Sequence, residues 1–506
     1  MHLANVLQGI APQIDVTLGG EITALTCDSR QVGPGTLFFA LRGSKSDGHL
    51  YIPQAVAAGA AAVVLEDATF APQELPWVQV ANGRVAMAQI AARFHGAPTQ
   101  GLPLIGITGT NGKTTTSYLI EAILQAAGLP AAVLGTISYR FGSIRIEASH
   151  TTPESTELQA IFRQLADAGA QAFVMEVSSH ALEQHRVDSC DFNVGVFTNL
   201  TRDHLDYHGT MEAYSVAKQR LFSDLLQPGL PGDLRCAVIN ADDPAAGDFI
   251  KAAACTVIQY GMAAAAEVTV RDISSSVDGI TGRLITPQGE QTFSSRLVGS
   301  YNLSNIMAAA AAAVALGIPL QTIVRGIEQQ ASVPGRLERV DNSCGVTCLV
   351  DYAHTGDALE NVLSTLRQLA TGRIITVFGC GGDRDNGKRP IMGRIAATYS
   401  DLAIVTSDNP RTEEPLSILA QIRNGILPLG VREYTVPELT GGCLKEKGFV
   451  MLENRREAIR LGANLALPGD IVLLAGKGHE DYQIIGTTKQ HFDDREEAAA
   501  AFREGR

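Results

Sequence analysis

Continuous apolar runs alternate with amphipathic segments through the middle of the chain. Apolar strands that helices separate in this way are typical of a parallel sheet covered on both faces. Each run therefore predicts a buried strand of one such sheet. These predicted strands are 102–108, 131–137, 172–178, 192–200 and 235–243.

The same alternation returns after residue 340, where apolar strands end in glycine-rich or polar loops. In open α/β sheets, ligands bind outside the carboxyl ends of the strands. The pattern thus predicts a Rossmann-like domain whose active loops follow its strands. The predicted strands are 347–353, 373–382, 401–410 and 470–478.

Two other regions follow different patterns. The first hundred residues mix short strands with a helix, and a later region predicts a small sheet followed by a helix. The N-terminal elements are strands at 35–43 and 60–66 with a helix at 51–59. The later elements are strands within 268–297, a turn at 278–282 and a helix at 303–317.

Pro- and Gly-rich breaks at 95–103 and 332–340 divide the chain. A chain of 506 residues also exceeds what one hydrophobic core usually supports. We therefore expect an α/β protein of three domains. They are a small N-terminal α/β domain (1–98), a central P-loop parallel-sheet domain (99–334) and a C-terminal Rossmann-like domain (335–506).

Composition narrows the class of protein. The formal net charge of −13 argues against a general nucleic-acid binder, although a local positive pocket would still accept a small anion. The N-terminus lacks a secretory pattern, and the alanine-rich run 307–316 is too short to span a bilayer. Eight cysteines without a CxxC pair predict reduced thiols in the cytoplasm, and Cys344 and Cys348 lack the second pair that a metal site would need.

The segment TGTNGKTTT (108–116) follows a predicted strand and opens a predicted helix. The strict P-loop pattern fails, because it needs a glycine where Ile107 stands. The segment still meets the physical requirements of a phosphate-binding loop, since its glycines let backbone N–H groups approach phosphate oxygens at a helix N-terminus. Lys113 would reach the β and γ phosphates, and the Thr114 hydroxyl would bind Mg²⁺. A turn that binds nothing is the alternative, but a turn needs no adjacent lysine and threonine.

In this form the loop resembles that of the Mur ligases and of folylpolyglutamate synthetase. Further motifs extend the resemblance from CDSR (27–30) almost to the C-terminus, and the ordered set resembles the Mur ligases that add the third amino acid of the peptidoglycan stem. In order, these motifs are MEVSSHALEQHR (175–186), FTNLTRDHLDYHGTMEAYSVAKQRLF (197–222), GSYNLSNIMAA (299–309), GRLERV (335–340), DYAHTGDALE (351–360), FGCGGDRDNGKRP (378–390), SDNPRTEEP (407–415) and AGKGHEDYQ (475–483).

The resemblance implies an ATP-dependent amide ligation in peptidoglycan precursor synthesis, and hence a role in cell-wall biogenesis, cell shape and cell division. The γ-phosphate passes to the D-glutamate carboxylate of UDP-MurNAc-L-Ala-D-Glu, and the amino group of meso-diaminopimelate attacks the acyl phosphate. Such chemistry needs metal ions that neutralise converging anions, and two Mg²⁺ ions are expected. The resemblance also implies a cytoplasmic monomer.

Four residues are implied to be catalytic: Lys113, Glu176, His204 and Lys218. Glu176 ends a predicted buried strand, where a carboxylate suggests a metal ligand. Mg²⁺ would be held by Thr114, Glu176, His204 and Lys218, the last as a carbamate.

Two of these positions have other interpretations. His204 and His208, four residues apart, would suit zinc, but no thiolate set accompanies them, and a solvated loop is expected for His208. Lys218 by itself would be a surface lysine. Carbamylation instead requires a pKa lowered by a partly buried, cationic setting.

The resemblance implies residues for each substrate. Among the residues implied to bind ATP, Asn302 and Asn305 have an alternative interpretation as helix-capping residues. Arg336 and Asp351 lie on either side of a predicted domain hinge. The ATP-binding residues are Gly109, Thr110, Asn111, Gly112, Lys113, Thr114, Thr115, Asn302, Asn305, Arg336 and Asp351. The UDP-precursor residues are Ser29, Ser44, Lys45, Ser46, Thr151, Thr152, Ser178, Gln184 and Arg186.

The implied diaminopimelate-binding residues are Arg384, Asp408, Asn409, Pro410, Arg411, Gly476 and Glu480. Arg411 would grip the distal carboxylate with two hydrogen bonds, and Glu480 would pair with the distal ammonium. L-lysine lacks that carboxylate and would leave the guanidinium unpaired. The alternatives are ligation of L-lysine, another Mur or polyglutamate ligase, and a P-loop ATPase without ligation.

Overall fold

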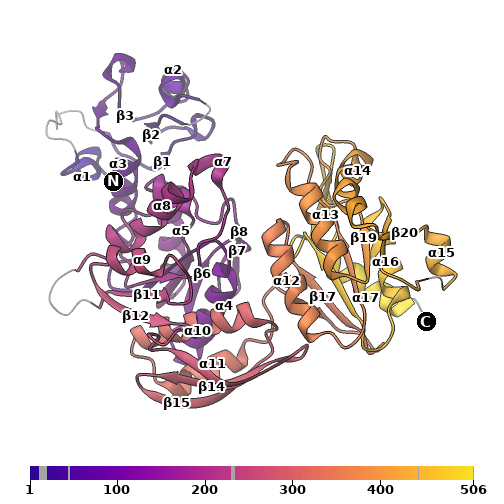
Figure 1. The fold of residues 1–506 in the computed structure, drawn as a ribbon. Helices are drawn as coiled ribbons and strands as arrows, with labels where there is room; N and C mark the ends of the chain where they lie inside the picture. Colours follow the sequence, from indigo (N-terminus) through magenta and orange to yellow (C-terminus); the bar gives the residue numbers. More distant parts are fainter. Residues whose placement is uncertain (11–19, 44–45, 229–233, 443, 505–506) are drawn as a thin grey trace. The chain divides into compact units, whose positions relative to one another are not determined.

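The computed structural model describes the chain except residues 11–19, 44–45, 229–233, 443 and 505–506 (Figure 1). Its contacts divide the chain into two compact units. The first comprises residues 1–270, 284–291 and 304–327, and the second comprises residues 271–283, 292–303 and 328–506. No helix among the described residues is both long enough and apolar enough to cross a membrane.

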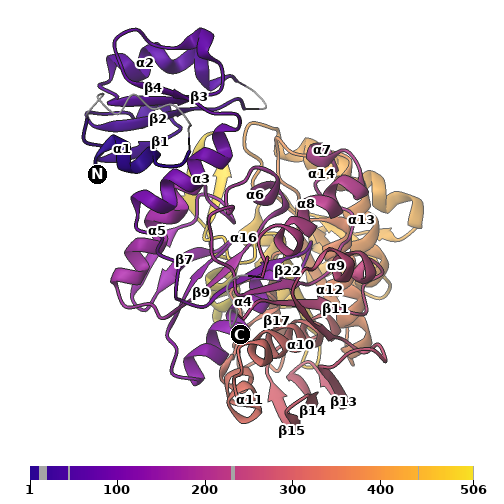
Figure 2. The ribbon, with the colours of Figure 1, turned by 90° about the vertical axis from the view of Figure 1, so that its left-hand side faces the viewer.

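The first unit begins with a four-stranded parallel sheet in the order β1-β2-β3-β4. Helices α1 and α3 lie on one face of this sheet and α2 lies on the other (Figure 2). A separate apolar cluster packs each face against its helices. The strands are β1 (Ala24–Thr26), β2 (Thr36–Ala40), β3 (Ala62–Leu65) and β4 (Trp77–Gln79). The helices are α1 (Leu3–Leu7), α2 (Ile52–Ala57) and α3 (Gly83–Phe94), with 3-10 turns η1 (Ser29–Gln31), η2 (Gly48–Tyr51) and η3 (Ala68–Phe70).

The first unit also contains an eight-stranded sheet, in the order β12-β11-β10-β5-β9-β6-β7-β8. Strands β12 to β6 are parallel, and β7 and β8 add an antiparallel edge. The strands are β5 (Leu104–Thr108), β6 (Ala131–Leu134), β7 (Ser138–Phe141), β8 (Ile144–Glu147), β9 (Ala172–Glu176), β10 (Val194–Phe197), β11 (Cys236–Asn240) and β12 (Thr256–Tyr260). The helices are α4 (Lys113–Ala126), α5 (Ser155–Asp167), α6 (Ser179–Glu183), α7 (Leu205–His208), α8 (Met211–Ser223) and α9 (Ala246–Ala252).

All five strands predicted for this sheet are confirmed, each shorter than its apolar run. The order β10-β5-β9 places the ends of three parallel strands next to one another. The loop after β5 is therefore adjacent to those that follow β9 and β10, which is where the candidate residues lie.

A three-stranded sheet follows, in the order β13-β14-β15. Its members are β13 (Thr269–Ser276), β14 (Gly279–Thr286) and β15 (Gly289–Ser295), and helices α10 (Ser300–Ala315) and α11 (Leu320–Gln329) come next. The turn predicted at 278–282 lies earlier, because Gly279 already begins β14. The helix predicted at 303–317 begins at Ser300 and ends at Ala315.

The second unit contains a seven-stranded sheet in the order β16-β17-β22-β18-β19-β21-β20, parallel apart from β16. All four predicted strands are confirmed. The strands are β16 (Glu338–Val340), β17 (Thr347–Asp351), β18 (Ile374–Phe378), β19 (Leu402–Val405), β20 (Arg432–Glu433), β21 (Gly448–Met451) and β22 (Ile471–Ala475), followed by the hairpin β23 (Tyr482–Ile485) and β24 (Thr488–His491).

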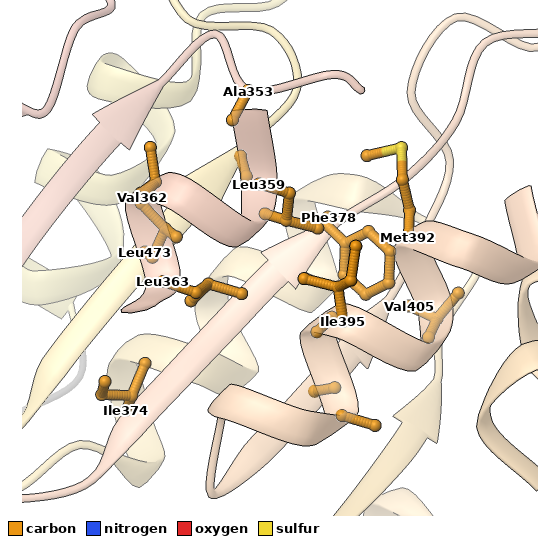
Figure 3. Packing of buried hydrophobic residues seen from close by; sticks show 14 of the residues in the cluster. Ala353, Leu359, Val362, Leu363, Ile374, Phe378, Met392, Ile395, Val405 and Leu473 are labelled. Carbon is orange, nitrogen blue, oxygen red and sulfur yellow. The ribbon is translucent and has the colours of Figure 1, made fainter. Parts of the chain in front are cut away.

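Helices cover both faces of this sheet. On one face, Phe378 of β18 packs among Leu359, Met392 and Ile395 from two helices (Figure 3). The helices are α12 (Gly356–Leu369), α13 (Lys388–Tyr399), α14 (Pro415–Ile426), η4 (Leu427–Leu429), α15 (Val436–Thr440), α16 (Arg455–Leu465) and α17 (Asp494–Glu504). The expected α/β class, with a parallel central sheet and a Rossmann-like C-terminal region, is confirmed. The exact boundaries of the three domains stay a prediction.

Candidate active site

The glycine-rich loop connects β5 to α4. Gly109 and Gly112 have positive φ angles of +148° and +88°. A Cβ atom on Gly109 would overlap Thr198 Oγ1, and one on Gly112 would overlap Asn305 Oδ1. Because only glycine fits both the backbone conformation and the space, the loop must hold its backbone close to β10 and α10. The N-terminus of α4 then directs its first N–H groups toward the loop, as a phosphate site requires.

Lys113 folds over this loop. Its Nζ donates to the carbonyl oxygens of Gly109 at 2.8 Å and Thr110 at 2.9 Å. The Thr110 hydroxyl donates to the carbonyl of Thr201, and the backbone N–H of Asn111 donates to the side chain of Asn199. The loop is thus tied to the segment that follows β10. Thr114 and Thr115 are buried in the first turn of α4.

Lys218 lies on α8 and is only 1% exposed. Its Nζ donates to the same carbonyl of Gly109 at 2.9 Å and lies 4.4 Å from the centre of the Tyr214 ring. Burial, and next the nearby charge of Lys113, hold the pKa of Lys218 well below 10.5. The prediction of a buried, cationic setting is confirmed, and the interpretation as a surface lysine is wrong.

Glu176 ends β9 and is buried, as predicted. Its Oε1 accepts a hydrogen bond from the backbone N–H of Thr136 at 3.0 Å, and its Oε2 accepts one from the Thr136 hydroxyl at 2.9 Å. A Cβ atom on Gly135 would overlap Oε1. A carboxylate has about four acceptor positions, so each oxygen keeps capacity for a further donor or a cation.

His204 precedes α7 with φ +52°, and its side chain is 47% exposed. Burial lowers its pKa, and the charges of Lys113 and Lys218 lower it further, so this histidine belongs to the same electrostatic environment as the loop. Neutral imidazole is the form that binds a metal.

His208 corrects an expectation. It is buried on α7, where its Nε2 lies 2.9 Å from Ser179 Oγ and its Nδ1 lies 2.9 Å from Glu183 Oε2. These contacts hold α7 against α6, so the prediction of a solvated loop histidine is wrong. Among the residues that the structure describes, no three His, Cys, Asp or Glu side chains gather as a metal-binding group.

Most of the predicted UDP-precursor residues meet beside the end of β9. The Thr152 hydroxyl donates to the carbonyl of Glu176 at 2.8 Å and accepts from the N–H of Ser178 at 3.1 Å. Arg186 donates to the carbonyl of Thr152 and to the side chain of Gln184, both at 2.8 Å. Thr151 joins this group through a hydroxyl contact of 3.1 Å with Thr136.

Glu154 is a member of this group that sequence reasoning missed. It lies 2.9 Å from Arg186 and 3.5 Å from Arg84 of α3, and so connects the N-terminal region to the end of β9. The sequence feature that could have pointed to Glu154 is its position two residues after the predicted Thr152.

The remaining predicted precursor residues lie in the N-terminal region. Ser29 is partly exposed, and its hydroxyl donates to the side chain of Gln54 at 3.2 Å. Ser46 is exposed. Ser44 and Lys45 lie outside the described residues.

In the second unit, the loop after β19 carries Asp408, Asn409, Pro410 and Arg411. Asp408 and Asn409 are buried, whereas Arg411 is partly exposed and has φ +53°. Arg411 Nη1 donates to the carbonyl of Gly382 at 2.7 Å, and its backbone N–H donates to Ile484 at 3.1 Å. This loop is therefore held between the loop after β18 and the hairpin β23–β24.

Two further predicted residues follow β22. Gly476 has φ +114°, and Glu480 Oε2 accepts a hydrogen bond from Asn409 Nδ2 at 2.9 Å. Asp408, Asn409, Gly476 and Glu480 therefore meet where β19 and β22 end. Arg384 lies on the loop after β18 and is exposed.

Sequence reasoning missed two buried cations of this region. Lys477 is fully buried between Asp408 and Glu480. Arg389 is also fully buried and pairs with Glu413 through two hydrogen bonds of 2.8 Å, which lower the pKa of Glu413. The only sequence feature that pointed to either residue was its place in a motif, AGKGHEDYQ for Lys477 and FGCGGDRDNGKRP for Arg389.

The predicted nucleotide residues divide between the units. Asn305, in the first unit, accepts from the Thr116 hydroxyl at 3.4 Å. Asn302, in the second, is buried in the first turn of α10, and its side-chain amide donates to the carbonyl of Val298 at 2.8 Å.

Arg336 and Asp351 lie in the second unit. Arg336 lies 4.9 Å from the centre of the Tyr352 ring. The Asp351 carboxylate accepts from the N–H groups of Leu337 and Ala353, both at 2.8 Å, and burial raises its pKa. Asp351 thus fixes the strand end to the segment that carries Arg336.

Comparison with known proteins identifies the family. Residues 107–313 match the Mur ligase middle domain, residues 335–478 match the Mur ligase glutamate ligase domain, and residues 21–95 match the Mur ligase family catalytic domain. A solved structure titled "UDP-N-acetylmuramoyl-L-alanyl-D-glutamate--2,6-diaminopimelate ligase" is 34% identical, with a TM-score of 0.70, and the match covers 100% of this chain and 99% of that one. The MurF ligase of Thermotoga maritima in complex with ADP, at 18% identity and a TM-score of 0.60 over 95% of this chain and 97% of that one, shares the fold.

Curated relatives extend over the whole chain. A UDP-N-acetylmuramoyl-L-alanyl-D-glutamate–2,6-diaminopimelate ligase of Geobacter sulfurreducens is 62% identical over 501 residues, covering 99% of this chain and 98% of that protein. The protein of the same name from Geobacillus kaustophilus is 46% identical over 506 residues and covers both chains completely. The order of the domains, the phosphate loop and the full-length matches agree, and the chain belongs to the Mur ligase family.

Proposed function

We propose that this chain joins meso-2,6-diaminopimelate to UDP-MurNAc-L-Ala-D-Glu in an ATP-dependent amide ligation of peptidoglycan precursor synthesis. The observation that carries the proposal is the 62% identity over 99% of the chain to a ligase of that name. The phosphate loop after β5 and the polar residues at the ends of β9, β19 and β22 support the same assignment.

ATP supplies the energy of the amide bond. Its γ-phosphoryl group passes to the D-glutamate carboxylate, so that an O–P bond forms as the β,γ-anhydride bond breaks and ADP leaves. The amino group of the incoming amino acid then attacks the acyl carbon, loses a proton, and expels inorganic phosphate. The loop contributes backbone N–H groups and the Lys113 ammonium to the phosphates.

Mg²⁺, as two ions, fits the residues around the loop. Thr114, Glu176, His204 and Lys218 as a carbamate would hold it. The fit rests on the buried Glu176 carboxylate, which keeps acceptor capacity on both oxygens beside Thr136. When bound, Mg²⁺ neutralises the converging phosphate and carboxylate charges.

The proposed carbamate of Lys218 would form by attack of the neutral amine on carbon dioxide, with loss of one proton. Burial of Lys218 at 1% exposure supports this proposal, because desolvation and the nearby charge of Lys113 disfavour the ammonium form more than the charge of Asp203 favours it. Carbamylation would turn this cation into an anion that suits a metal ion.

The precursor would contact the first unit through the group beside β9. Arg186 offers a guanidinium for a phosphate or carboxylate, and Ser178 and Thr152 offer hydrogen bonds beside Glu176. Ser29, Ser44, Lys45 and Ser46 would complete this site. We propose residues 1–98 as the precursor-binding domain, 99–334 as the ATP-binding domain and 335–506 as the amino-acid-binding domain.

The amino acid would contact the loops after β18, β19 and β22. Arg411 would pair with the distal carboxylate of diaminopimelate, and Glu480 would pair with its distal ammonium. L-lysine would lack the partner for Arg411. Asn302, Asn305, Arg336 and Asp351 would serve the adenine and ribose side of ATP, and we propose that the enzyme acts as a cytoplasmic monomer.

The test is direct product analysis. The purified chain, incubated with ATP, Mg²⁺, UDP-MurNAc-L-Ala-D-Glu and meso-diaminopimelate, should form the UDP-MurNAc-tripeptide, detected by its mass. No tripeptide in the complete mixture would refute the function, and tripeptide formation with L-lysine at the same rate would refute the proposed selectivity.

A further inference from the structure

Lys477 is a buried cation at the centre of the candidate amino-acid site. It follows Gly476 at the end of β22, and its side chain is 0% exposed. Its Nζ donates to Asn409 Oδ1 at 3.2 Å and to Glu480 Oε2 at 3.4 Å, and it lies 3.5 Å from Asp408 Oδ1. Three residues of the predicted diaminopimelate site therefore share this one ammonium group.

The ammonium and its carboxylate partners differ in exposure. The side chains of Asp408 and Glu480 are 11% and 17% exposed, whereas that of Lys477 is closed to solvent. A ligand would therefore reach the carboxylates and not the ammonium behind them. Lys477 would act on a ligand only through the groups that it holds.

The charges of this group do not cancel. Two carboxylates and one ammonium leave one net negative charge. The negative charge of Asp408 favours uptake of a proton by Glu480. The charge of Lys477 opposes that tendency, although burial and Asp408 still raise the pKa of Glu480 above 4.5. One further ammonium, supplied by a ligand, would bring the group to neutrality.

Lys477 also fixes the orientation of the Asn409 amide. Asn409 Oδ1 accepts from Lys477 Nζ and from the backbone N–H of Ile484 at 3.0 Å. With two donors on one side, the oxygen must face them, and the amide nitrogen must face Glu480, to which it donates at 2.9 Å. The Glu480 carboxylate is thereby held by two donors from its inner side.

We propose that Lys477 is a positioning residue for the incoming amino acid, because it holds Asp408, Asn409 and Glu480 as a pocket with one net negative charge that accepts the distal ammonium of the substrate. This inference rests on the proposed function and adds a residue to its specificity site. If Lys477 only filled space in the core, a neutral side chain of similar size would serve equally well.

The experiment varies the charge at this position in the full chain. Initial rates are measured against meso-diaminopimelate at saturating ATP and precursor for wild type, Lys477→Met and the double variant Lys477→Met/Asp408→Asn, which restores one net negative charge. Lys445→Met, at an exposed lysine of the same unit, is the matched control. If Lys477→Met does not fold, Lys477→Gln takes its place.

Lys477→Met should raise the KM for diaminopimelate by about 30-fold or more, as for the loss of one partner of a buried charge pair, while the KM values for ATP and precursor change less than about threefold. The double variant should recover about tenfold of that loss. In Lys477→Met, ATP should still raise the unfolding temperature, whereas diaminopimelate should no longer do so.

A KM for diaminopimelate within about threefold of wild type, an equal rise for all three substrates, or no recovery in the double variant would overturn the inference. A wild type without diaminopimelate-dependent turnover would overturn the proposed function and this inference with it.

Discussion

Lys113 and Lys218 donate hydrogen bonds to the same atom, the carbonyl oxygen of Gly109, at 2.8 Å and 2.9 Å. They come from different helices, α4 and α8, and only Lys218 is fully enclosed. Two ammonium groups on one carbonyl oxygen repel each other, and the buried one yields its proton more readily. The phosphate loop thus has one partly exposed lysine and, next to it, a buried lysine suited to covalent modification.

Lys218→Ala should reduce turnover by at least about 100-fold, because the proposed carbamate would be lost. Short carboxylates such as acetate or propionate should restore part of the activity by occupying the space of the carbamate. Lys251→Ala, at an exposed lysine of the same unit, is the control. Turnover of Lys218→Ala equal to wild type would remove Lys218 from the site.

Arg411→Ala should weaken the use of diaminopimelate far more than the use of ATP. The guanidinium is held by the carbonyl of Gly382 and would lose its pairing with the distal carboxylate, so the KM for diaminopimelate should rise by about 30-fold or more. Arg423→Ala, an exposed arginine on α14 that pairs with Glu433, should leave both KM values unchanged. Equal losses for the two substrates would contradict the role of Arg411.

Gly382→Ala should impair the diaminopimelate site although no charged side chain is replaced. A Cβ atom there would overlap the carbonyl of Pro410, which forces the loops after β18 and β19 apart. The strain should cost about 1–3 kcal/mol of unfolding free energy and raise the KM for diaminopimelate, with ATP binding retained. Gly247→Ala is the control, since nothing lies within 4 Å of a Cβ atom at that position. Thermal unfolding and kinetics check both effects, and unchanged diaminopimelate kinetics would show that the two loops move independently.

Binding of diaminopimelate should weaken as the pH falls. Burial, followed by the neighbouring Asp408 carboxylate, raises the pKa of Glu480 above 4.5, although Lys477 and Asn409 oppose the shift. Glu480 therefore takes up its proton at a higher pH than an ordinary glutamate, and the neutral acid no longer attracts an ammonium. The KM for diaminopimelate, measured from about pH 7 down to about pH 5, should rise more steeply in wild type than in Glu480→Gln. Parallel pH profiles would contradict this assignment.

The sequence predicted the buried strands and the position of Glu176 well, because continuous apolar runs identify parallel strands and a carboxylate at a strand end stands out. The edge strands β8 and β12 were missed, and so was β7, which lies between β6 and β8. The residues of β8 alternate between partly buried and exposed, and those of β12 are mostly half-buried, so neither segment has a continuous apolar run. Edge strands therefore lack the continuous apolar run by which interior strands are predicted.

Side-chain burial away from the strands could not be read from local patterns. Lys218 appears on an amphipathic helix as a surface residue, and its enclosure comes from the loop at Gly109, 109 positions earlier in the chain. His208 is buried by Ser179, 29 positions away. Lys477 and Arg389 likewise find their partners on other loops of the sheet. Such contacts depend on how elements distant in the sequence pack together, and they cannot be predicted from local periodicity.

The most direct measurement is phosphate release from ATP by the purified chain with UDP-MurNAc-L-Ala-D-Glu present, compared with meso-diaminopimelate, with L-lysine and with no acceptor. Sustained release should require the precursor and diaminopimelate together, and L-lysine should support release far less well. Release that continues without the precursor, or that is the same with and without an amino-acid acceptor, would contradict the assignment of this chain as a diaminopimelate-adding ligase.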